Sequence, residues 1–225
     1  ISTGGTIASR VDYRTGAVQP ALTAEDLTSV VPELVSLADI DAHILYSEYS
    51  ENLTPAHWKG IAEETAKRIT ARADGIVISH GTDTMHYTAA ALSFALQNLP
   101  VPVMIVGSQR SSDRPSSDAA SNLTGAVGLA ARANMAVVGL VMHQDLSDRF
   151  MVAHRGTRVR KCHTSRRDTF KSINSLPIAK YDLENRTVET FDNVPERDMT
   201  RSLGLKAHFD SHAYLLKFYP GFNPA

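Results

Sequence analysis

The chain has 225 residues, of which 43% are hydrophobic, so it is long enough to bury a core in one domain and part of a second. Its 23 Lys and Arg side chains nearly balance 24 Asp and Glu, which argues against a strongly basic nucleic-acid-binding protein or a polyacidic one. The single cysteine, Cys162, excludes an intrachain disulfide and an all-cysteine zinc site, so we expect a cytoplasmic protein without a metal site. No apolar stretch approaches the roughly 20 residues that span a bilayer.

The opening stretch ISTGG reads as a strand entered part-way, followed by four more β-rich runs that alternate with helix-like stretches. We predict strands at residues 43–46, 75–79, 101–106 and 136–142. Such alternation is typical of βαβ units. The sequence therefore predicts an α/β fold with a doubly wound, mostly parallel sheet covered by helices.

Helix start signals accompany these strands. Thr54 and Pro55 suit the N-cap and the first helical position of a helix over residues 57–73. The segment 23–26 resembles a capping box that precedes an earlier helix, and a further helix is predicted over residues 87–96. In doubly wound sheets the loops after the strands open on one edge, where ligands bind. We therefore expect the motifs on these loops to converge.

The pattern changes after residue 142. Residues 150–154 and 157–161, joined by Arg155 and Gly156, are predicted to form a β-hairpin, with further β structure over 178–191. We assign residues 1–192 to a catalytic domain whose start is missing. Residues 193–212 are predicted to be a linker, and 213–225 the beginning of a second α/β domain.

The first candidate site motif is TGGT, residues 3–6, at the end of the first strand. Two glycines there allow the backbone to approach a ligand and leave Thr6 on the loop, where its hydroxyl is able to attack a carbonyl. The alternative is an ordinary glycine-rich turn. It is not a dinucleotide-binding fingerprint, because the third glycine is absent.

The second motif, HGTDTM at residues 80–85, joins an apolar strand to a helix. Thr82 and Asp83 thus lie near a helix N-terminus, where backbone N–H groups stabilise an anion. The alternative interpretation is that they only cap the helix. For His80 we favour a structural hydrogen bond to the backbone over a general-base role.

The third motif is a basic run with seven Lys and Arg side chains from Arg155 to Lys171, which makes contact with phosphate or tRNA a reasonable hypothesis. Strand alternation, however, places Lys161 on the face opposite Arg158 and Arg160. A partly desolvated lysine serves as a proton carrier for a threonine nucleophile. The polar loop with Ser50 and Glu51 is suited to hold the charged ends of an amino acid, or is simply a connection to the Thr54 cap.

Four features in order and spacing resemble the asparaginase/glutaminase family: TGGTIAS, Ser50-Glu51 eight residues before Trp58, HGTDTM, and Lys161 nine residues before FKSIN. The resemblance runs over nearly the whole chain. It implies amide hydrolysis by a Thr6 nucleophile through an acyl-enzyme, assisted by Tyr13. It further implies a proton relay from Lys161 through Thr82. Asp83 and Glu51 would hold the substrate ammonium and Ser50 its carboxylate.

Within the family, the segments ASRVDYRTGAV, MHYTAAALSF, SSDRPSSDAASNL and HRGTRVRKCHTSRRD resemble the D-type subunits of archaeal glutamyl-tRNA(Gln) amidotransferases. That resemblance implies that glutamine or asparagine is the amide donor and that ammonia passes to an E-type kinase and transamidase subunit. The partner would use ATP and Mg²⁺ to amidate Glu-tRNA(Gln), and this subunit would need no cofactor. A homodimer within a heterotetramer is implied.

Two alternatives remain open at this point. One is a free L-asparaginase that acts without tRNA or a partner. The other is a non-catalytic scaffold that docks a partner or tRNA through the basic run.

Overall fold

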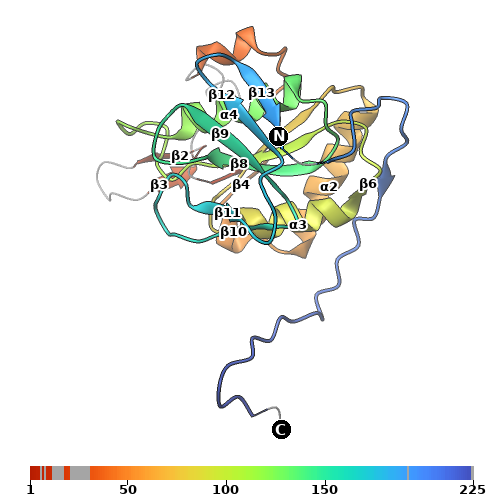
Figure 1. Ribbon diagram of the computed structural model, residues 1–225. Helices are drawn as coiled ribbons and strands as arrows, with labels where there is room; N and C mark the ends of the chain where they lie inside the picture. Colours follow the sequence, from red (N-terminus) through yellow and green to blue (C-terminus); the bar gives the residue numbers. More distant parts are fainter. Residues whose placement is uncertain (6, 8, 12–17, 21–30, 192, 224–225) are drawn as a thin grey trace.

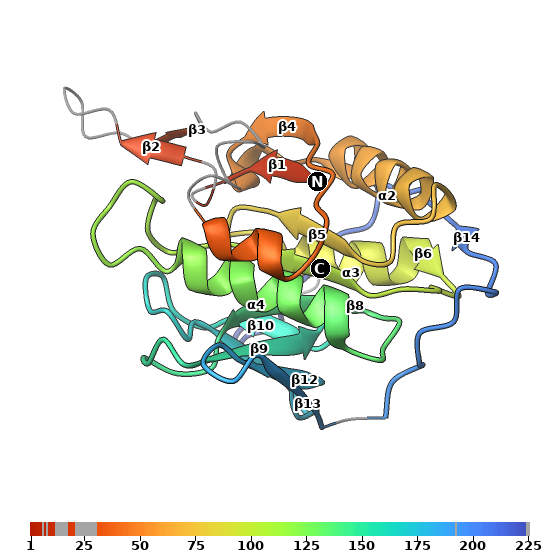
Figure 2. The ribbon, with the colours of Figure 1, turned by 90° about the horizontal axis from the view of Figure 1, so that it is seen from above.

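A central sheet with helices on both faces organises the computed structural model (Figures 1 and 2). The structure describes residues 1–225 except 6, 8, 12–17, 21–30, 192 and 224–225, and gives only the backbone at 9–11 and 18–20. Eight strands form the sheet in the order β13-β12-β9-β8-β7-β5-β1-β4. Four strand pairs from β4 to β8 are parallel, and the three from β8 to β13 are antiparallel.

The parallel part consists of β1 (Ser2–Gly4), β4 (Ile44–Glu48), β5 (Ile76–Ser79), β7 (Val103–Val106) and β8 (Val138–His143). The antiparallel part adds β9 (Phe150–Arg155), β12 (Ala179–Asp182) and β13 (Thr187–Thr190). The helices are η2 (Pro32–Ser36), η3 (Ser50–Asn52), α2 (Pro55–Thr70), α3 (Met85–Ala95) and α4 (Ala119–Arg132). Three small pairs complete the fold: β2 (Ser9–Val11) with β3 (Val18–Pro20), β6 (Leu96–Gln97) with β14 (Gly204–Leu205), and β10 (Val159–Lys161) with β11 (Phe170–Ser172).

The sheet separates two apolar cores because successive side chains of a strand point to opposite faces. In β7, Val103 and Ile105 join the core under α2 and α3, whereas Met104 and Val106 join the core under α4. All four are fully buried. Burial of each such side chain contributes about 1.5–3 kcal/mol to folding.

Helix α2 begins where its capping residues predict. Pro55 occupies the first helical position after Thr54. The Thr54 backbone N–H donates to His57 Nδ1 at 3.0 Å, so the imidazole takes the place of the usual Glu or Gln of a capping box. The predicted helices over 57–73 and 87–96 correspond to α2 and α3, and the four predicted strands to β4, β5, β7 and β8. The helix predicted after residues 23–26 lies outside the described residues.

The α/β class and the mostly parallel, doubly wound sheet are therefore confirmed. The hairpin predicted over 150–161 is wrong in its pairing. β9 pairs with β8 and β12, and β10 pairs antiparallel with β11 outside the main sheet. Both edges of β9 are therefore hydrogen-bonded to other strands, so β10 cannot pair with β9 to form a hairpin. A turn closed by the hydrogen bond from the Arg158 N–H to the Arg155 carbonyl leads the chain away from the main sheet.

The segment predicted as a linker packs on the domain for much of its length. Arg197 donates to the Ala130 carbonyl at 2.7 Å, β14 pairs with β6, and Phe209 lies edge-on to Trp58. Residues 213–219 then run away from the body without secondary structure, and Figure 1 shows this extension. The division into domains remains a prediction.

Candidate functional site

Three loops converge at the carboxyl ends of the parallel strands. β1 lies between β4 and β5, so the chain leaves β1 toward one neighbour and reaches the other only after α2. Such a reversal of strand order is where ligands bind in doubly wound sheets. The loops after β1, β4 and β5 carry the residues predicted from the sequence.

Glycines make this convergence possible. Gly5 has a φ of +79°, and a Cβ added there would lie 2.3 Å from the Gly81 nitrogen. A Cβ on Gly81 would in turn lie 2.7 Å from Ser50 Oγ. Since real Cβ atoms do not approach this closely, only glycine fits at both positions. The TGGT, HGTDTM and Ser50 loops are therefore in direct contact.

Lys161 reaches this edge from β10. Its ammonium Nζ donates to Thr82 Oγ1 and to Asp83 Oδ1, each at 2.8 Å. The Lys161 side chain is only 9% exposed, whereas that of Asp83 is 68% exposed. A largely buried cation thus faces a hydroxyl and a solvent-accessible carboxylate, as the alternation in the basic run predicts.

Gln109 is a further contact of Thr82 that sequence reasoning did not single out. The Thr82 hydroxyl donates to Gln109 Oε1 at 3.2 Å, and Gln109 Nε2 donates to the Arg166 carbonyl at 2.9 Å. The signal was available, because Gln109 follows β7 at the same sheet edge. Its loop is also fixed at Ser112, whose hydroxyl donates to the Ile7 carbonyl.

Asp118 fixes the backbone of the Gln109 loop. It occupies the N-cap position of α4, but its carboxylate makes no capping hydrogen bond there. Instead it accepts the backbone N–H groups of Gln109 and Arg110, each at 3.0 Å. The fully buried carboxylate also accepts from Asn122 Nδ2 at 2.9 Å.

A buried polar chain continues from Asn122 toward the basic run. Asn122 Nδ2 also donates to the Gly107 carbonyl, so its Oδ1 is left as the acceptor for His143 Nδ1 at 2.7 Å. His143 Nε2 lies 3.0 Å from Asp148 Oδ1, and Arg167 donates to the same carboxylate. Both ring nitrogens of His143 thus face oxygen atoms, which fixes the orientation of the ring.

His80 is structural, as its strand-end position indicated. Its Nδ1 lies 2.8 Å from the Gly81 carbonyl, to which it donates, and its Nε2 accepts the Thr88 hydroxyl at 2.8 Å. The indole N–H of Trp58 donates to the same hydroxyl. Burial lowers the pKa of His80 to about 4, against a weaker opposing effect of the Gly81 hydrogen bond. The ring is therefore neutral near pH 7.

The two residues predicted on the loop after β4 differ in exposure. Ser50 is buried, and its carbonyl accepts the Thr84 hydroxyl at 2.7 Å, which ties the η3 loop to the start of α3. Glu51 is exposed. Thr6 and Tyr13 lie outside the described residues.

Carboxylates inside and beside the basic run bind several of its cations. Asp168 accepts from Arg166 at 2.9 Å and from Lys171 at 2.8 Å. Burial raises the pKa of Asp168, but the hydrogen bonds from these two cations outweigh it and bring the value to about 2. Arg167 binds Asp148. This part of the run is therefore a folded structural element rather than an open basic surface.

Two negative findings concern the described part of the chain alone. It contains no group of three or more His, Cys, Asp or Glu side chains placed to hold a metal ion. None of its helices combines the length and apolar character needed to cross a membrane.

Comparison with known proteins places this geometry in a family. The sequence profile "Asparaginase, N-terminal" matches residues 1–195. The chain belongs to the asparaginase family. Among solved members of the asparaginase family, the thermostable L-asparaginase from Thermococcus kodakarensis superposes with a TM-score of 0.83 at 29% identity, over 99% of this chain and 64% of that one. L-asparaginase I from Vibrio cholerae gives 0.82 at 29% identity, over the same shares.

Curated relatives in the asparaginase family are closer in sequence. The D-type subunit of glutamyl-tRNA(Gln) amidotransferase from Thermococcus kodakarensis is 52% identical over 98% of this chain, and its counterpart from Metallosphaera sedula is 50% identical over 100%. The chain spans about half the length of these relatives, 50% and 51% respectively. The amidotransferase resemblance read from the four sequence segments is thereby confirmed.

Proposed function

We propose that the protein hydrolyses the side-chain amide of glutamine or asparagine and supplies the ammonia for converting Glu-tRNA(Gln) to Gln-tRNA(Gln). The observation that carries the hydrolytic part is the contact of Lys161 with both Thr82 and Asp83 at the sheet edge where ligands bind. Family membership supports the reaction class. The names of the curated relatives support the tRNA-dependent use of the ammonia.

In the proposed mechanism Thr6 attacks the amide carbon and forms an acyl-enzyme, and Tyr13 assists its activation. Lys161 relays the proton through Thr82. In the arrangement described, Lys161 donates to Thr82, while the Thr82 hydrogen points to Gln109. Proton relay therefore needs Lys161 in its neutral form and the Thr82 hydrogen turned toward Nζ.

Substrate recognition is assigned to the exposed side of the same site. Asp83 and Glu51 hold the substrate ammonium, and Ser50 holds its carboxylate. The exposure of both acidic groups and the close approach of Ser50 to Gly81 support this division. Backbone N–H groups of the Thr82 loop stabilise the oxyanion before water hydrolyses the acyl-enzyme.

The complex in which the protein is proposed to act is inferred from the names of the curated relatives. The protein acts as a homodimer with an E-type kinase and transamidase subunit, which uses ATP and Mg²⁺ to activate Glu-tRNA(Gln). The subunit to which this chain belongs requires no cofactor of its own, and the complex works in the cytoplasm.

The test is ammonia release from glutamine by the full-length protein with its partner, with and without Glu-tRNA(Gln) and ATP. We expect stimulation by the tRNA and ATP together. Thr6→Ala removes the nucleophile and Lys161→Met the proton-transfer group, so each should lower the rate at least about a hundredfold. Lys59→Met, which removes an exposed lysine of α2, should leave the rate unchanged. Full activity of Thr6→Ala would overturn the mechanism.

A free L-asparaginase is the second candidate. Its supporting observation is the close superposition on two solved L-asparaginases. It predicts rapid ammonia release from asparagine without partner, tRNA or ATP. Such release, unaltered by adding the partner complex, would replace the amidotransferase proposal and leave the site assignment intact.

A further inference from the structure

The loop between β7 and α4, residues 107–118, connects the two halves of the proposed site. Near its start, Gln109 Oε1 accepts the Thr82 hydroxyl at 3.2 Å. Three residues further on, the Ser112 hydroxyl donates to the Ile7 carbonyl at 2.6 Å, and Ile7 directly follows the proposed nucleophile in the sequence. One short loop therefore contacts both the nucleophile segment and the segment of the proton relay.

The first half of this loop is held in place by its own hydroxyl groups. The Arg110 carbonyl accepts the Ser108 hydroxyl at 2.8 Å and the Ser117 hydroxyl at 3.0 Å. Ser108 and Ser111 are buried, whereas residues 113–116 are exposed. The loop thus has a fixed base, from which the contacts with the site are made, and a solvent-exposed tip.

Asp118 binds the base of the loop. Its carboxylate accepts the backbone N–H groups of Gln109 and Arg110 and the side-chain amide of Asn122. The carboxylate is fully buried, and these donors are all neutral. Burial of a carboxylate is costly unless hydrogen bonds replace those of water. The loop backbone is therefore stable only where its N–H groups meet this carboxylate.

Helix α4 does not depend on the Asp118 carboxylate for its start. The Ser117 hydroxyl accepts the Ala119 N–H at 3.2 Å, and the Asp118 carbonyl accepts the Asn122 N–H at 3.0 Å, as in a regular first turn. The carboxylate itself makes no capping hydrogen bond. The side chain of Asp118 therefore serves the loop before the helix rather than the helix.

We propose that Asp118 is a positioning residue for amide hydrolysis, which acts through segment 109–112 and sets the Thr82 hydroxyl relative to the nucleophile segment. This inference rests on the proposed function, because only that function gives the two segments a catalytic role. Substrate binding is assigned to other residues, Asp83 and Glu51 among them. A displaced loop should therefore slow turnover and leave substrate affinity nearly unchanged.

The test is kcat and KM for amide hydrolysis by Asp118→Asn, in the full-length protein with its partner. Asparagine keeps the size of the side chain but replaces one acceptor oxygen by a donor, so the N–H groups of Gln109 and Arg110 are no longer both satisfied. We expect kcat to fall at least about tenfold and KM to change less than about twofold, since a shift of about 1 Å in a reacting group costs up to about a hundredfold.

Asp182→Asn is the matched control. Asp182 is also buried, and it accepts the backbone N–H groups of Glu184 and Asn185 and the Asn185 side-chain amide, in addition to Arg149. It lies at the end of β12, in the antiparallel part of the sheet. We expect this variant to lose stability and keep its kcat. An unaltered kcat of Asp118→Asn, or an equal fall in both variants, would overturn the proposal.

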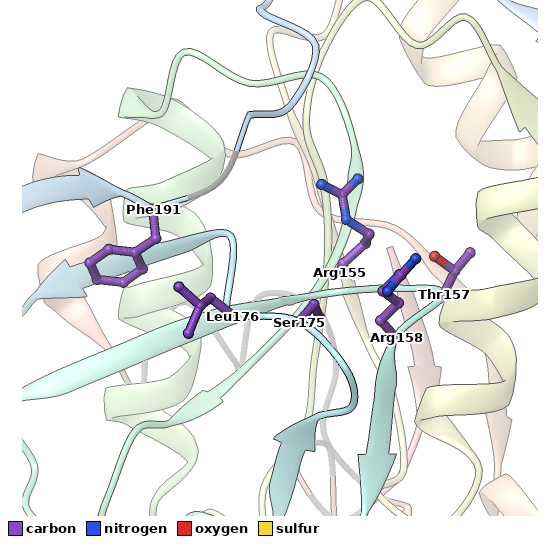
Figure 3. Close-up of a pocket in the computed structure, with 6 residues that line it drawn as sticks. All are labelled: Arg155, Thr157, Arg158, Ser175, Leu176 and Phe191. Atoms are coloured by element: carbon purple, nitrogen blue, oxygen red, sulfur yellow. The ribbon is translucent and has the colours of Figure 1, made fainter.

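Ser112→Ala decides the matter if Asp118→Asn does not fold, since it removes only the hydrogen bond to Ile7 from the same loop. We expect kcat to fall about threefold with KM unchanged, because one of the two contacts of the loop with the site is lost. An unchanged kcat would contradict the positioning role. Thr157→Ala is the control, because it removes an exposed hydroxyl from the pocket in Figure 3, which no residue of the loop lines.

Hydrogen exchange at the Gln109 and Arg110 amides separates this inference from the proposed function. We expect both amides to be protected in the unmodified protein and to exchange at least about tenfold faster in Asp118→Asn. Equal exchange in the two proteins would show that Asp118 does not hold the loop. If the unmodified protein releases no ammonia at all, the proposed function fails, while the exchange rates still decide whether the carboxylate fixes the loop.

Discussion

The Thr82 hydroxyl makes hydrogen bonds with two other side chains. Lys161 donates to its oxygen, and its own hydrogen goes to Gln109. Gln109 is fixed on its other side by the Arg166 carbonyl, so its amide cannot rotate freely. We assign Gln109 the role of a positioning residue that sets the direction of the Thr82 hydroxyl.

Gln109→Glu tests that role. The new carboxylate still accepts from Thr82 but no longer donates to Arg166, and it places a negative charge near Lys161. The side chain that fixes the direction of the Thr82 hydroxyl thereby loses its own anchor, so kcat should fall about tenfold while KM changes little, because a misplaced catalytic group slows the chemical step. The measurement is kcat and KM for amide hydrolysis. Gln97→Glu, at an exposed position on β6, is the control, and an unchanged kcat of Gln109→Glu would argue against the positioning role.

Residue-level prediction from the sequence succeeded where a local rule applied. Alternation along 158–161 put Lys161 on the inward face, and the motif HGTDTM put Thr82 after a strand. The contacts of Gln109 with Thr82 and Arg166, and that of Asn122 with His143, could not be predicted in this way. They join residues 27, 57 and 21 positions apart, through side-chain directions that only the packed fold determines.

Among the elements, α4 shows how close packing depends on small residues. A Cβ on Gly128 would lie 2.4 Å from two ring atoms of Tyr181, which is fully buried under the helix. A ring in that position cannot move aside without disturbing β12. Gly128 therefore allows α4 to lie against the antiparallel half of the sheet.

Gly128→Ala should accordingly destabilise the protein by about 1–3 kcal/mol through overpacking, even though alanine favours a helix by about 1 kcal/mol. Gly60→Ala in α2 is the matched comparison. Its Cβ would meet mainly the hydroxyl end of Tyr46, a partly exposed side chain that can shift. Chemical denaturation of both variants is the measurement. Equal loss of stability in the two would show that ring packing on α4 is not the cause.

The elements themselves were largely predictable, and the error in the hairpin is informative. Hydrophobic period and cap residues located β5, β7, β8 and α2, because each is determined by its own sequence. The pairing of β9 was not, because strand partners depend on which edges of the sheet are already occupied. Residues 150–161 contain a turn, but no local sequence signal specifies that β12 pairs with β9.

At the scale of the whole molecule, two buried histidines connect stability to pH. Burial lowers the pKa of both His80 and His154 to about 4. The unfolded chain takes up these protons near the ordinary histidine value of about 6.5, before the folded chain does. Stability is therefore complete above that pH and falls as the pH drops toward 4, by up to about 3 kcal/mol for each histidine.

The predicted measurement is the free energy of unfolding of the full-length protein at pH 7, 6 and 5. In His154→Gln, the free energy of unfolding should fall less steeply as the pH is lowered, because one buried histidine with a lowered pKa is gone. His212→Gln, whose side chain is 88% exposed, should leave the pH dependence unchanged. A His154→Gln slope identical to the unmodified one would contradict the assignment of the acid sensitivity to buried histidines.

The separation of β10 and β11 from the main sheet has a practical meaning for protein engineering. This small unit brings Lys161 to one edge and begins near Arg158 at the other, yet its backbone ladder contains only three residue pairs. It can therefore be exchanged between relatives if its buried Val159 and Phe170, which belong to the core under α2 and α3, are kept. A chimera of this kind, with the corresponding segment of an L-asparaginase, would change the surroundings of the lysine and keep the packing on the eight-stranded sheet.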